Sequence, residues 1–350
     1  MTLSNSFTIQ DRLIGGNQSC FLIAEVAQSH DGSLGFAHSF IDAAADAGVD
    51  AIKFQTHIAS AESTVDEQFR IPFSYEDKNR YDYWKRMEFT LEQWNGLKKH
   101  AVKRNIIFLS SIFSVDAAEL MEKIGIPAWK IGSGEINNPQ LLSRIFKTDK
   151  PILLSTGMSD WKEIDDTVKK FQKEKNPLAL FQCTSKYPSN LSEVGLNIFD
   201  AFKKRYNVPV GLSDHSGTLF PSLAAMAKGS SLIEVHVTFH KSIFGPDVSA
   251  SITLEELKML AQARDAFHVM QVCPVDKNKM AAELSDMRNL FNKSVALKND
   301  QSAGTILTGN MLTTKKPGNG IPASDLNKCI GKVLKNDVSA TQLLSWEKLV

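Results

Sequence analysis

The sequence lacks the features that mark secreted, membrane-spanning or nucleic-acid-binding proteins. Only four cysteines occur among 350 residues, with no CxxC pair, as is typical of a protein in a reducing compartment. No apolar run approaches membrane-spanning length, and the opening residues, MTLSNSFTIQDRLIGG, have no signal-peptide core. Lys and Arg (40) balance Asp and Glu (39), so the net charge of +1 attracts neither nucleic acid nor an anionic membrane. We expect a cytoplasmic protein with no nucleic-acid or membrane partner.

What the chain does contain is a repeated alternation of short apolar runs and helical patterns. The hydrophobic content of 43% and charged content of 23% are ordinary for a globular protein. Continuous apolar strands separated by helices favour a parallel sheet that is covered by those helices. The predicted strands are 21–26, 50–55, 106–111, 127–133, 151–156, 178–183, 208–213 and 231–237.

Eight strand–helix units in about 250 residues match the size of a (β/α)₈ barrel. A doubly wound open sheet is the alternative. Its glycine-rich dinucleotide turn is missing after the first strand, which reads AEVAQSHDGS. The sequence therefore predicts a TIM barrel, with its chemistry at the C-terminal ends of the strands.

The ends of the predicted strands carry charged and hydrogen-bonding side chains. Lys53 and Lys130 are notable because a buried ammonium group needs a partner. A structural ion pair with a nearby glutamate is one explanation. Alternatively, the two lysines, several hydroxyls and the backbone amides near Gly132 and Gly157 suit a phosphate-bearing anion. The polar strand-end residues are Glu25, Lys53, Gln55, Ser110, Ser111, Lys130, Ser133, Glu135, Ser155, Thr156, Thr184, Ser185, Tyr187, Asp214, His215, Glu234 and His236.

Two of these residues, His215 and His236, follow neighbouring parallel strands and could bind one divalent metal ion. Two imidazoles without a cysteine cluster suit a six-coordinate ion such as Mn²⁺ better than structural zinc. The alternative is that each histidine is a hydrogen-bonded core or loop residue.

Two further regions depart from the repeating pattern. The connection 57–90 is long and aromatic, and it predicts either a lid over the strand ends or a dimer surface. From about Ser294 turn residues and short strands replace the long helices. We divide the chain into a barrel (1–275), a linker (276–293) and a small domain (294–350), whose KKPGNG loop (315–320) is basic.

Taken together, the motifs of the chain resemble those of the sialic acid synthase family, the phosphoenolpyruvate-condensing nonulosonate synthases. The matches follow the family's order and cover nearly the whole chain, including a C-terminal region similar to the antifreeze-like (SAF) domain. They are IAEVAQSHDGS (23–33), IKFQTH (52–57), KIGSGEINN (130–138), LSTGMS (154–159), CTSKYP (183–188), GLSDHS (211–216), EVHVTF (234–239), GPD (245–247) and KPGNG (316–320).

The resemblance implies a barrel followed by an SAF domain, a domain-swapped homodimer and a cytoplasmic enzyme of surface-sugar biosynthesis. The reaction would condense phosphoenolpyruvate with an open-chain N-acetylhexosamine such as N-acetylmannosamine and release phosphate. His215 and His236 would hold Mn²⁺, with Mg²⁺ or Co²⁺ as alternatives, and Glu25, Glu135 and Glu234 would serve as acid, base or positioning groups. Phosphoenolpyruvate would contact Lys53, Ser111, Lys130, Ser133, Ser155, Ser185 and Ser213, and the sugar would contact Gln55, Tyr187, Asp247 and Lys316.

Three positions depart from the family pattern. Lys316 stands where sialic acid synthases often have arginine, and lysine cannot form the same planar fork. Ser185 replaces an asparagine of some members, and Val235 replaces a basic residue but should face away from the barrel interior. The first two leave the sugar open, so a legionaminic or pseudaminic acid synthase that uses a 2,4-diacetamido-2,4,6-trideoxyhexose is the alternative. A metal-dependent barrel aldolase and a non-enzymatic sugar-binding protein are more distant ones.

Overall fold

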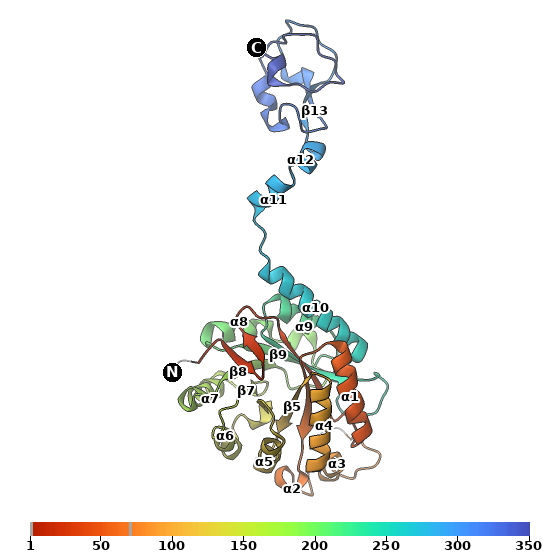
Figure 1. Ribbon diagram of the computed structural model, residues 1–350, viewed down its shortest axis with the longest axis vertical. Coiled ribbons are helices and arrows are strands. Elements are labelled where there is room, and N and C mark those ends of the chain that lie inside the picture. Colours follow the sequence, from red (N-terminus) through yellow and green to blue (C-terminus); the bar gives the residue numbers. More distant parts are fainter. Residues whose placement is uncertain (1–2, 70–71) are drawn as a thin grey trace. The chain divides into compact units, whose positions relative to one another are not determined.

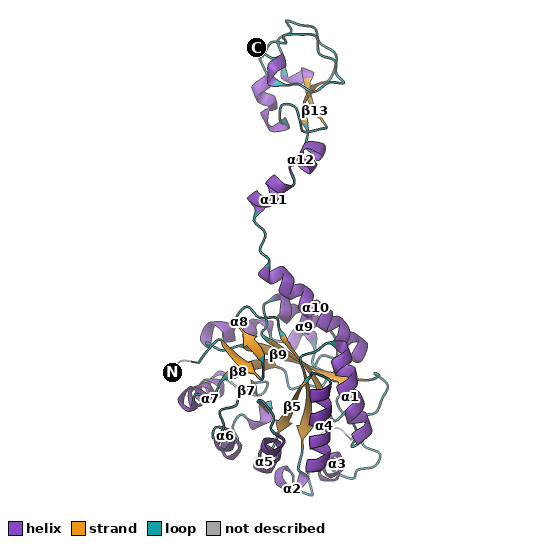
Figure 2. Cartoon of the chain, viewed as in Figure 1, coloured by secondary structure: helices purple, strands orange, loops and turns teal. Residues whose placement is uncertain are grey.

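The computed structural model describes residues 3–69 and 72–350, and these fall into two compact units that divide between Val272 and Cys273 (Figure 1). No helix in the described parts of the chain is long and apolar enough to cross a membrane. The first unit holds a parallel sheet surrounded by helices (Figure 2).

Eight parallel strands close into a barrel in the first unit. The last of them, β10 (Leu232–Thr238), pairs with the first, β3 (Phe21–Ala27), and also with β9 (Val210–Asp214), so the sheet has no free edge at this point. This closure confirms the predicted (β/α)₈ architecture. The other strands are β4 (Ala51–Thr56), β5 (Ile107–Ile112), β6 (Trp129–Ile131), β7 (Ile152–Ser155) and β8 (Leu178–Cys183), and a two-residue strand β11 (Ile252–Thr253) pairs in parallel with the end of β10.

The helices around the barrel begin and end at residues suited to those places. Ser33 accepts a hydrogen bond from a backbone N–H of its helix, and Thr90 and Asp160 form capping boxes. Gly48 and Gly125 end their helices with positive φ. The helices are α1 (Leu34–Ala47), α2 (Ala59–Glu62), α3 (Arg80–Met87), α4 (Leu91–Lys103), α5 (Val115–Ile124), α6 (Pro139–Ile145), α7 (Trp161–Glu174), α8 (Leu196–Arg205), α9 (Phe220–Ala227) and α10 (Leu254–Val272).

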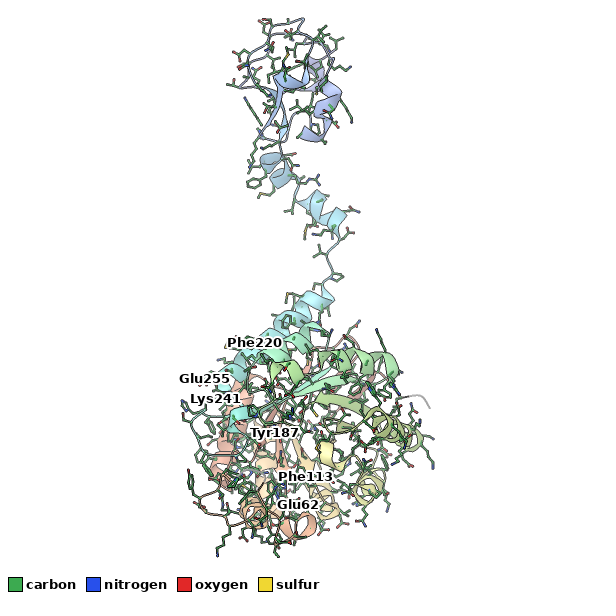
Figure 3. All side chains as sticks on the ribbon, turned by 180° about the vertical axis from the view of Figure 1, so that it is seen from behind. Glu62, Phe113, Tyr187, Phe220, Lys241 and Glu255 are labelled. Carbon is green, nitrogen blue, oxygen red and sulfur yellow. The ribbon has the colours of Figure 1, made fainter. Side chains whose placement is uncertain are left out.

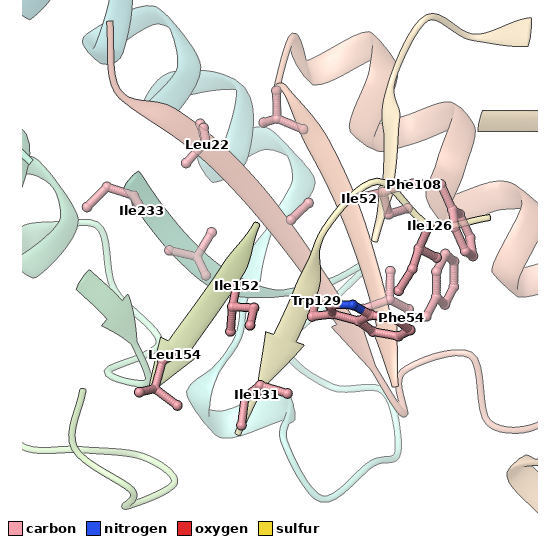
Figure 4. Packing of buried hydrophobic residues seen from close by; sticks show 14 of the residues in the cluster. Leu22, Ile52, Phe54, Phe108, Ile126, Trp129, Ile131, Ile152, Leu154 and Ile233 are labelled. Atoms are coloured by element: carbon pink, nitrogen blue, oxygen red, sulfur yellow. The ribbon is translucent and has the colours of Figure 1, made fainter. Parts of the chain in front are cut away.

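Apolar side chains form separate layers outside and inside the barrel wall. The outer layer joins strands to helices and includes Leu22, Phe54 and Trp129 (Figure 4). Val235 belongs to this outer layer, as predicted from strand alternation. The inner cluster includes Ile23 on β3. Alternate residues of each strand therefore serve two different cores.

An N-terminal hairpin, β1 (Ser6–Ile9) and β2 (Arg12–Gly15), completes the inner cluster. Its side chains Phe7, Ile9 and Ile14 are buried together with barrel-lining residues such as Leu153. No helix or strand was predicted before Phe21, so the hairpin was missed from sequence.

The second unit has its own small core beneath an antiparallel pair of strands. Val295, Leu312 and Leu344 are among its buried residues. In the loop after the second strand, the Gly318 N–H donates to the Asn289 carbonyl, and the Lys316 ammonium lies over the Phe291 ring. The regular elements are α11 (Lys277–Glu283), α12 (Ser285–Phe291), β12 (Ser294–Leu297) and β13 (Leu312–Lys315).

Candidate active site

The inward face of the barrel strands changes from apolar to polar toward their C-terminal ends. On β3, Ile23 is followed two residues later by Glu25, and both side chains are buried. Because all eight strands are parallel, the polar ends meet at one mouth of the barrel. The same step joins Ala51 to Lys53, Leu109 to Ser111, Ala128 to Lys130, Leu153 to Ser155 and Leu232 to Glu234.

Two lysines and two glutamates form the charged centre of this mouth. The Lys53 ammonium lies 2.6 Å from Glu25 and donates to the Ser111 hydroxyl at 2.6 Å. Glu234 lies 3.6 Å from the ammonium groups of both Lys53 and Lys130. All four ionisable side chains are less than 5% exposed, so the cluster is shielded from solvent.

The two glutamates are held in different protonation ranges. Burial raises the pKa of Glu25 to about 7, against the opposing effect of Lys53 and with a contribution from Glu234. Burial also acts on Glu234, but the two lysines outweigh it and lower its pKa to about 2. Glu25 is therefore the carboxyl group that can exchange a proton near neutral pH, while Glu234 stays ionised between the lysines.

A pocket of about 300 Å³ opens beside the lysines, and all seven residues predicted to contact phosphoenolpyruvate line it. Lys130 donates to the Ser155 hydroxyl at 2.6 Å, and the Gly157 N–H donates to Ser133 at 2.9 Å. A Cβ atom on Gly157 would lie only 2.6 Å from the Cys183 sulfur, so this wall requires glycine. The predicted contact residues that line this pocket are Lys53, Ser111, Lys130, Ser133, Ser155, Ser185 and Ser213.

His215 and His236 share this pocket, and their ring centroids lie 5.3 Å apart. The His215 Nδ1 lies 2.8 Å from the Thr184 carbonyl. Because a carbonyl only accepts, Nδ1 carries the proton and Nε2 keeps its lone pair, as in metal-bound histidines. Burial lowers the pKa of both rings and favours their neutral form. In the described residues no group of three or more potential ligand residues occurs, so water or substrate would complete the coordination.

The His236 ring fits such a site for a second reason. Its Nδ1 is buried and has no hydrogen-bond partner within residues 3–69 and 72–350. A buried imidazole nitrogen without a partner loses hydration without compensation. The pair thus has the chemistry of a two-histidine metal site.

A larger cavity of about 710 Å³ adjoins the first, and its lining includes Gln55, Tyr187 and Asp247, which were predicted to contact the sugar. Figure 3 labels Tyr187, Phe113 and Glu62 from this lining. Glu135 also lines this cavity rather than the charged centre, and it accepts a hydrogen bond from Asn138. Burial raises the pKa of Glu135. The fourth predicted sugar contact, Lys316, belongs to the second unit.

The described residues of the long connection 57–90 form one wall of this cavity. Its aromatic residues Phe69, Phe73, Tyr83 and Trp84 line the cavity, and the last two are buried. Of the two interpretations from sequence, a lid over the strand ends or a dimer surface, this arrangement agrees with the first.

Sequence reasoning gave no role to six polar residues that line the larger cavity: Gln28, His57, Glu62, Glu67, Arg80 and Ser249. Strand alternation could have found His57, because it continues the inward series of Lys53 and Gln55. Glu62 sits at the end of α2, beyond the strand, so no periodic signal marks it.

Fold and site together define a (β/α)₈-barrel protein with a charged, hydroxyl-lined mouth and a small C-terminal β domain. The NeuB family model matches residues 40–272 and the SAF domain model matches residues 292–350, and the chain belongs to the NeuB family. This membership confirms the resemblance read from the motifs.

Similar proteins carry names that give different products. The chain is 34% identical to N,N'-diacetyllegionaminic acid synthase of Campylobacter jejuni, over 92% of this chain and 98% of that protein. It is 31% identical to human N-acetylneuraminate-9-phosphate synthase, with 92% and 90% covered. A crystal structure of N-acetylneuraminic acid synthetase from Leptospira borgpetersenii superposes with a TM-score of 0.72 at 30% identity, covering 82% of this chain and 98% of that one.

Proposed function

We propose that this protein is a nonulosonic (sialic-type) acid synthase that condenses phosphoenolpyruvate with an open-chain N-acetylhexosamine and releases phosphate. The observation that carries the proposal is the buried cluster of Lys53, Lys130 and Glu234 beside a pocket of hydroxyl groups. Burying two ammonium groups costs free energy, which is offset when they bind a multiply charged anion. The family and its named synthases support this reaction class.

The lysines orient phosphoenolpyruvate and balance its charge in this proposal. Lys53 and Lys130 contact its anionic groups together with Ser111 and Ser155, which they already hydrogen bond. The enol carbon then attacks the sugar aldehyde, water adds at the resulting cationic carbon, and phosphate leaves by C–O cleavage. Holding both substrates in one water-poor mouth supplies the proximity that this bimolecular step needs.

Glu25 is the acid–base group of the proposal. Its pKa of about 7 lets it give up or take a proton near neutral pH, whereas Glu234 remains ionised and keeps both lysines in place. Glu135 lies in the larger cavity, where it can contact the acceptor. The three glutamates thus take different roles.

His215 and His236 hold the divalent cation in this proposal, Mn²⁺ first, with Mg²⁺ or Co²⁺ as alternatives. Bound there, the cation supplies Lewis acidity toward the acceptor's aldehyde oxygen. The protein's own contribution is the Thr184 carbonyl, which fixes the His215 tautomer. Chelation should abolish activity, and Mn²⁺ should restore it.

The acceptor is an N-acetylhexosamine such as N-acetylmannosamine, with a 2,4-diacetamido-2,4,6-trideoxyhexose as the alternative. The identities of 34% and 31% to synthases with different products do not separate these sugars. Gln55, Tyr187 and Asp247 line the cavity that would receive the acceptor.

The proposal includes a domain-swapped homodimer in the cytoplasm, where phosphoenolpyruvate is produced. Val269 and Met270 of the first unit and Met287, Leu290 and Phe291 of the second are exposed apolar residues, and a second chain would cover them. Lys316 would then serve the partner's cavity. Deleting residues 294–350 should raise the KM for the sugar sharply and leave metal binding intact, and light scattering should report a dimer for the full chain.

The direct test is to incubate the purified chain with phosphoenolpyruvate, Mn²⁺ and a panel of hexosamines. Phosphate release that depends on both substrates is expected, and the product mass identifies the sugar. Absence of phosphate release with every sugar would refute the proposal. Pyruvate consumption or release without phosphoenolpyruvate would identify an aldolase instead.

A further inference from the structure

A buried His57–Glu62 pair lies in the wall of the larger cavity, next to Gln55. The His57 Nδ1 is 2.5 Å from a Glu62 oxygen, and its Nε2 is 3.1 Å from the Gln55 Oε1. Gln55 in turn donates from its Nε2 to Glu25 at 2.8 Å. A continuous chain of hydrogen bonds therefore runs from Glu62 through His57 and Gln55 to Glu25.

The direction of these hydrogen bonds follows from their two ends. Glu25 uses one oxygen for the Lys53 ammonium, and its other oxygen accepts from the Gln55 amide nitrogen. When Glu25 is ionised it can only accept, so the Gln55 oxygen faces away from it and accepts from Gln28 and from the His57 Nε2. His57 therefore carries a proton on Nε2.

The short Glu62 contact is compatible with this proton on Nε2. Burial lowers the pKa of His57, and the Glu62 carboxylate opposes that effect. A second proton lies between Nδ1 and the Glu62 oxygen, which are 2.5 Å apart, and the two groups share it. With Nε2–H directed at Gln55, both ring nitrogens are hydrogen bonded.

Stacking fixes the plane of the His57 ring. The ring lies between Trp84 and Phe113, with centroid distances of 3.7 and 4.4 Å and interplanar angles of 10° and 8°. A flat ring held on both faces and bonded at both nitrogens has little freedom to turn.

We propose that the His57–Glu62 pair is a positioning device that holds the Gln55 carboxamide with its nitrogen on Glu25 and its oxygen turned away. The inference deepens the proposed function, on which it rests, by adding two residues that act through Gln55 on the acceptor and on the acid–base group. Without the pair, Gln55 loses one of the two donors that keep its oxygen away from Glu25.

Two amide substitutions at position 57 separate positioning from space filling. Glutamine in His57→Gln reaches about as far as Nε2 and can still donate to Gln55, whereas asparagine in His57→Asn reaches only to Nδ1. We expect His57→Asn to lower kcat/KM for the hexosamine about tenfold with an unchanged KM for phosphoenolpyruvate, and His57→Gln to stay within about threefold of the native chain. Equal losses in both variants, or no loss in either, would overturn the proposal.

Glu62→Gln tests whether the pair positions Gln55 or relays protons. A glutamine amide can donate to Nδ1 of a neutral ring whose Nε2 still donates to Gln55, so we expect activity within about threefold of the native chain. A loss as large as that of His57→Asn would mean proton transfer through the pair and would refute a positioning role.

Nitrogen-15 NMR of histidine-labelled full-length protein reads the pair without any substrate. We expect one ring with a slowly exchanging Nε2–H that disappears in His57→Asn, among the eight histidines. A His57 ring without a proton on Nε2 would overturn the inference even in an active enzyme. If the native chain releases no phosphate with any sugar, the proposed function fails while this measurement still decides the tautomer.

Discussion

The two ends of the barrel interior are built from the same strands but serve opposite purposes. At the N-terminal end, residues such as Ile23 and Leu153 pack with the hairpin residue Ile9 into a fully apolar cluster. Two residues farther along β3 and β7, the same faces carry Glu25 and Ser155 at the charged mouth. The apolar residues that stabilise the barrel and the polar residues of the charged mouth are thus only two positions apart on the same strand.

Burial contributes differently to folding stability at the two ends. Burying apolar side chains at the N-terminal end contributes favourably to folding. Burying Lys53, Lys130, Glu25 and Glu234 at the other end is at best neutral, because desolvation cancels much of their attraction. Truncating a side chain at the N-terminal end should therefore lower stability without changing activity. Substituting a residue at the mouth should lower activity more than stability.

The largest effect is expected from Lys53→Ala at the mouth. The Glu25–Lys53 distance is 2.6 Å, and the substitution removes both this ion pair and a proposed phosphoenolpyruvate contact. We expect phosphate release to fall by about 10²–10³-fold, with a higher KM for phosphoenolpyruvate. Steady-state kinetics of phosphate release measures both.

Lys169→Ala is the matched control for that substitution, because Lys169 is exposed and pairs only with the nearby Asp166 in the interactions described. Its kinetics should equal those of the native chain. If Lys53→Ala kept full activity, the charged mouth would be a structural feature only, and the contrast between the two ends would lose its functional meaning.

The next effect should appear at the opposite end with Ile9→Ala. Ile9 is completely buried among barrel residues, so truncation leaves a cavity that costs about 3 kcal/mol of unfolding free energy. The mouth is untouched, and kcat should not change. Leu13→Ala in the same hairpin is the control: its side chain is 41% exposed, and it should cost less than about 1 kcal/mol. If urea unfolding showed equal losses of unfolding free energy for Ile9→Ala and Leu13→Ala, the packing of the hairpin against the barrel would not contribute to stability.

A smaller effect concerns acid, which should act on the loop that follows β3. Burial lowers the pKa of His30 to about 3, and its Nδ1 accepts from the Gly32 N–H. The unfolded ring titrates near 6.5, so the folded state excludes the proton, and stability present above pH 6.5 is lost as pH falls toward 3. At pH 5 the loss amounts to about 2 kcal/mol.

His30→Asn should remove that acid sensitivity while retaining an acceptor for Gly32. We expect the drop in unfolding free energy between pH 7.5 and pH 5 to shrink by about 2 kcal/mol in urea titrations. His240→Asn is matched, since His240 accepts from the Ser242 N–H in the same geometry but is exposed. An unchanged pH dependence in His30→Asn would mean that the buried ring can be protonated at little cost.

Continuous apolar runs separated by helical patterns made the barrel predictable, because every unit repeats the same local pattern. The predicted strand boundaries differ from the observed ones by one or two residues. Residues 127–133 were predicted as a strand, but β6 covers only Trp129–Ile131, and a 3₁₀ turn begins at Ser133. The N-terminal hairpin escaped notice since its four-residue strands bury side chains only against a barrel that must already exist.

The site was predictable to the extent that strand ends meet at one mouth. The pairing of side chains there depends on the register between strands. This register places Lys53 of β4 beside Glu25 of β3. Glu135 lies apart from the charged residues at the mouth, because it belongs to a 3₁₀ turn after β6 and lines the larger cavity. The His57 partner Glu62 lies at the end of the four-residue helix α2, so the strand period could not have indicated it.

The smallest effect is expected from Arg12→Met, which tests how the N-terminal hairpin is attached to the barrel. Asp50 accepts from Arg12 at 3.0 Å, from Arg264 of α10 at 2.9 Å and from the Leu22 N–H at 2.8 Å. Arg12 is 25% exposed and Arg264 only 11%, so solvent already screens the first pair. We expect Arg12→Met to cost about 0.5 kcal/mol with unchanged kinetics, and Arg264→Met to cost clearly more. Urea unfolding that reversed this order would show that the exposed hairpin pair, rather than the apolar cluster and α10, secures the closed end of the barrel.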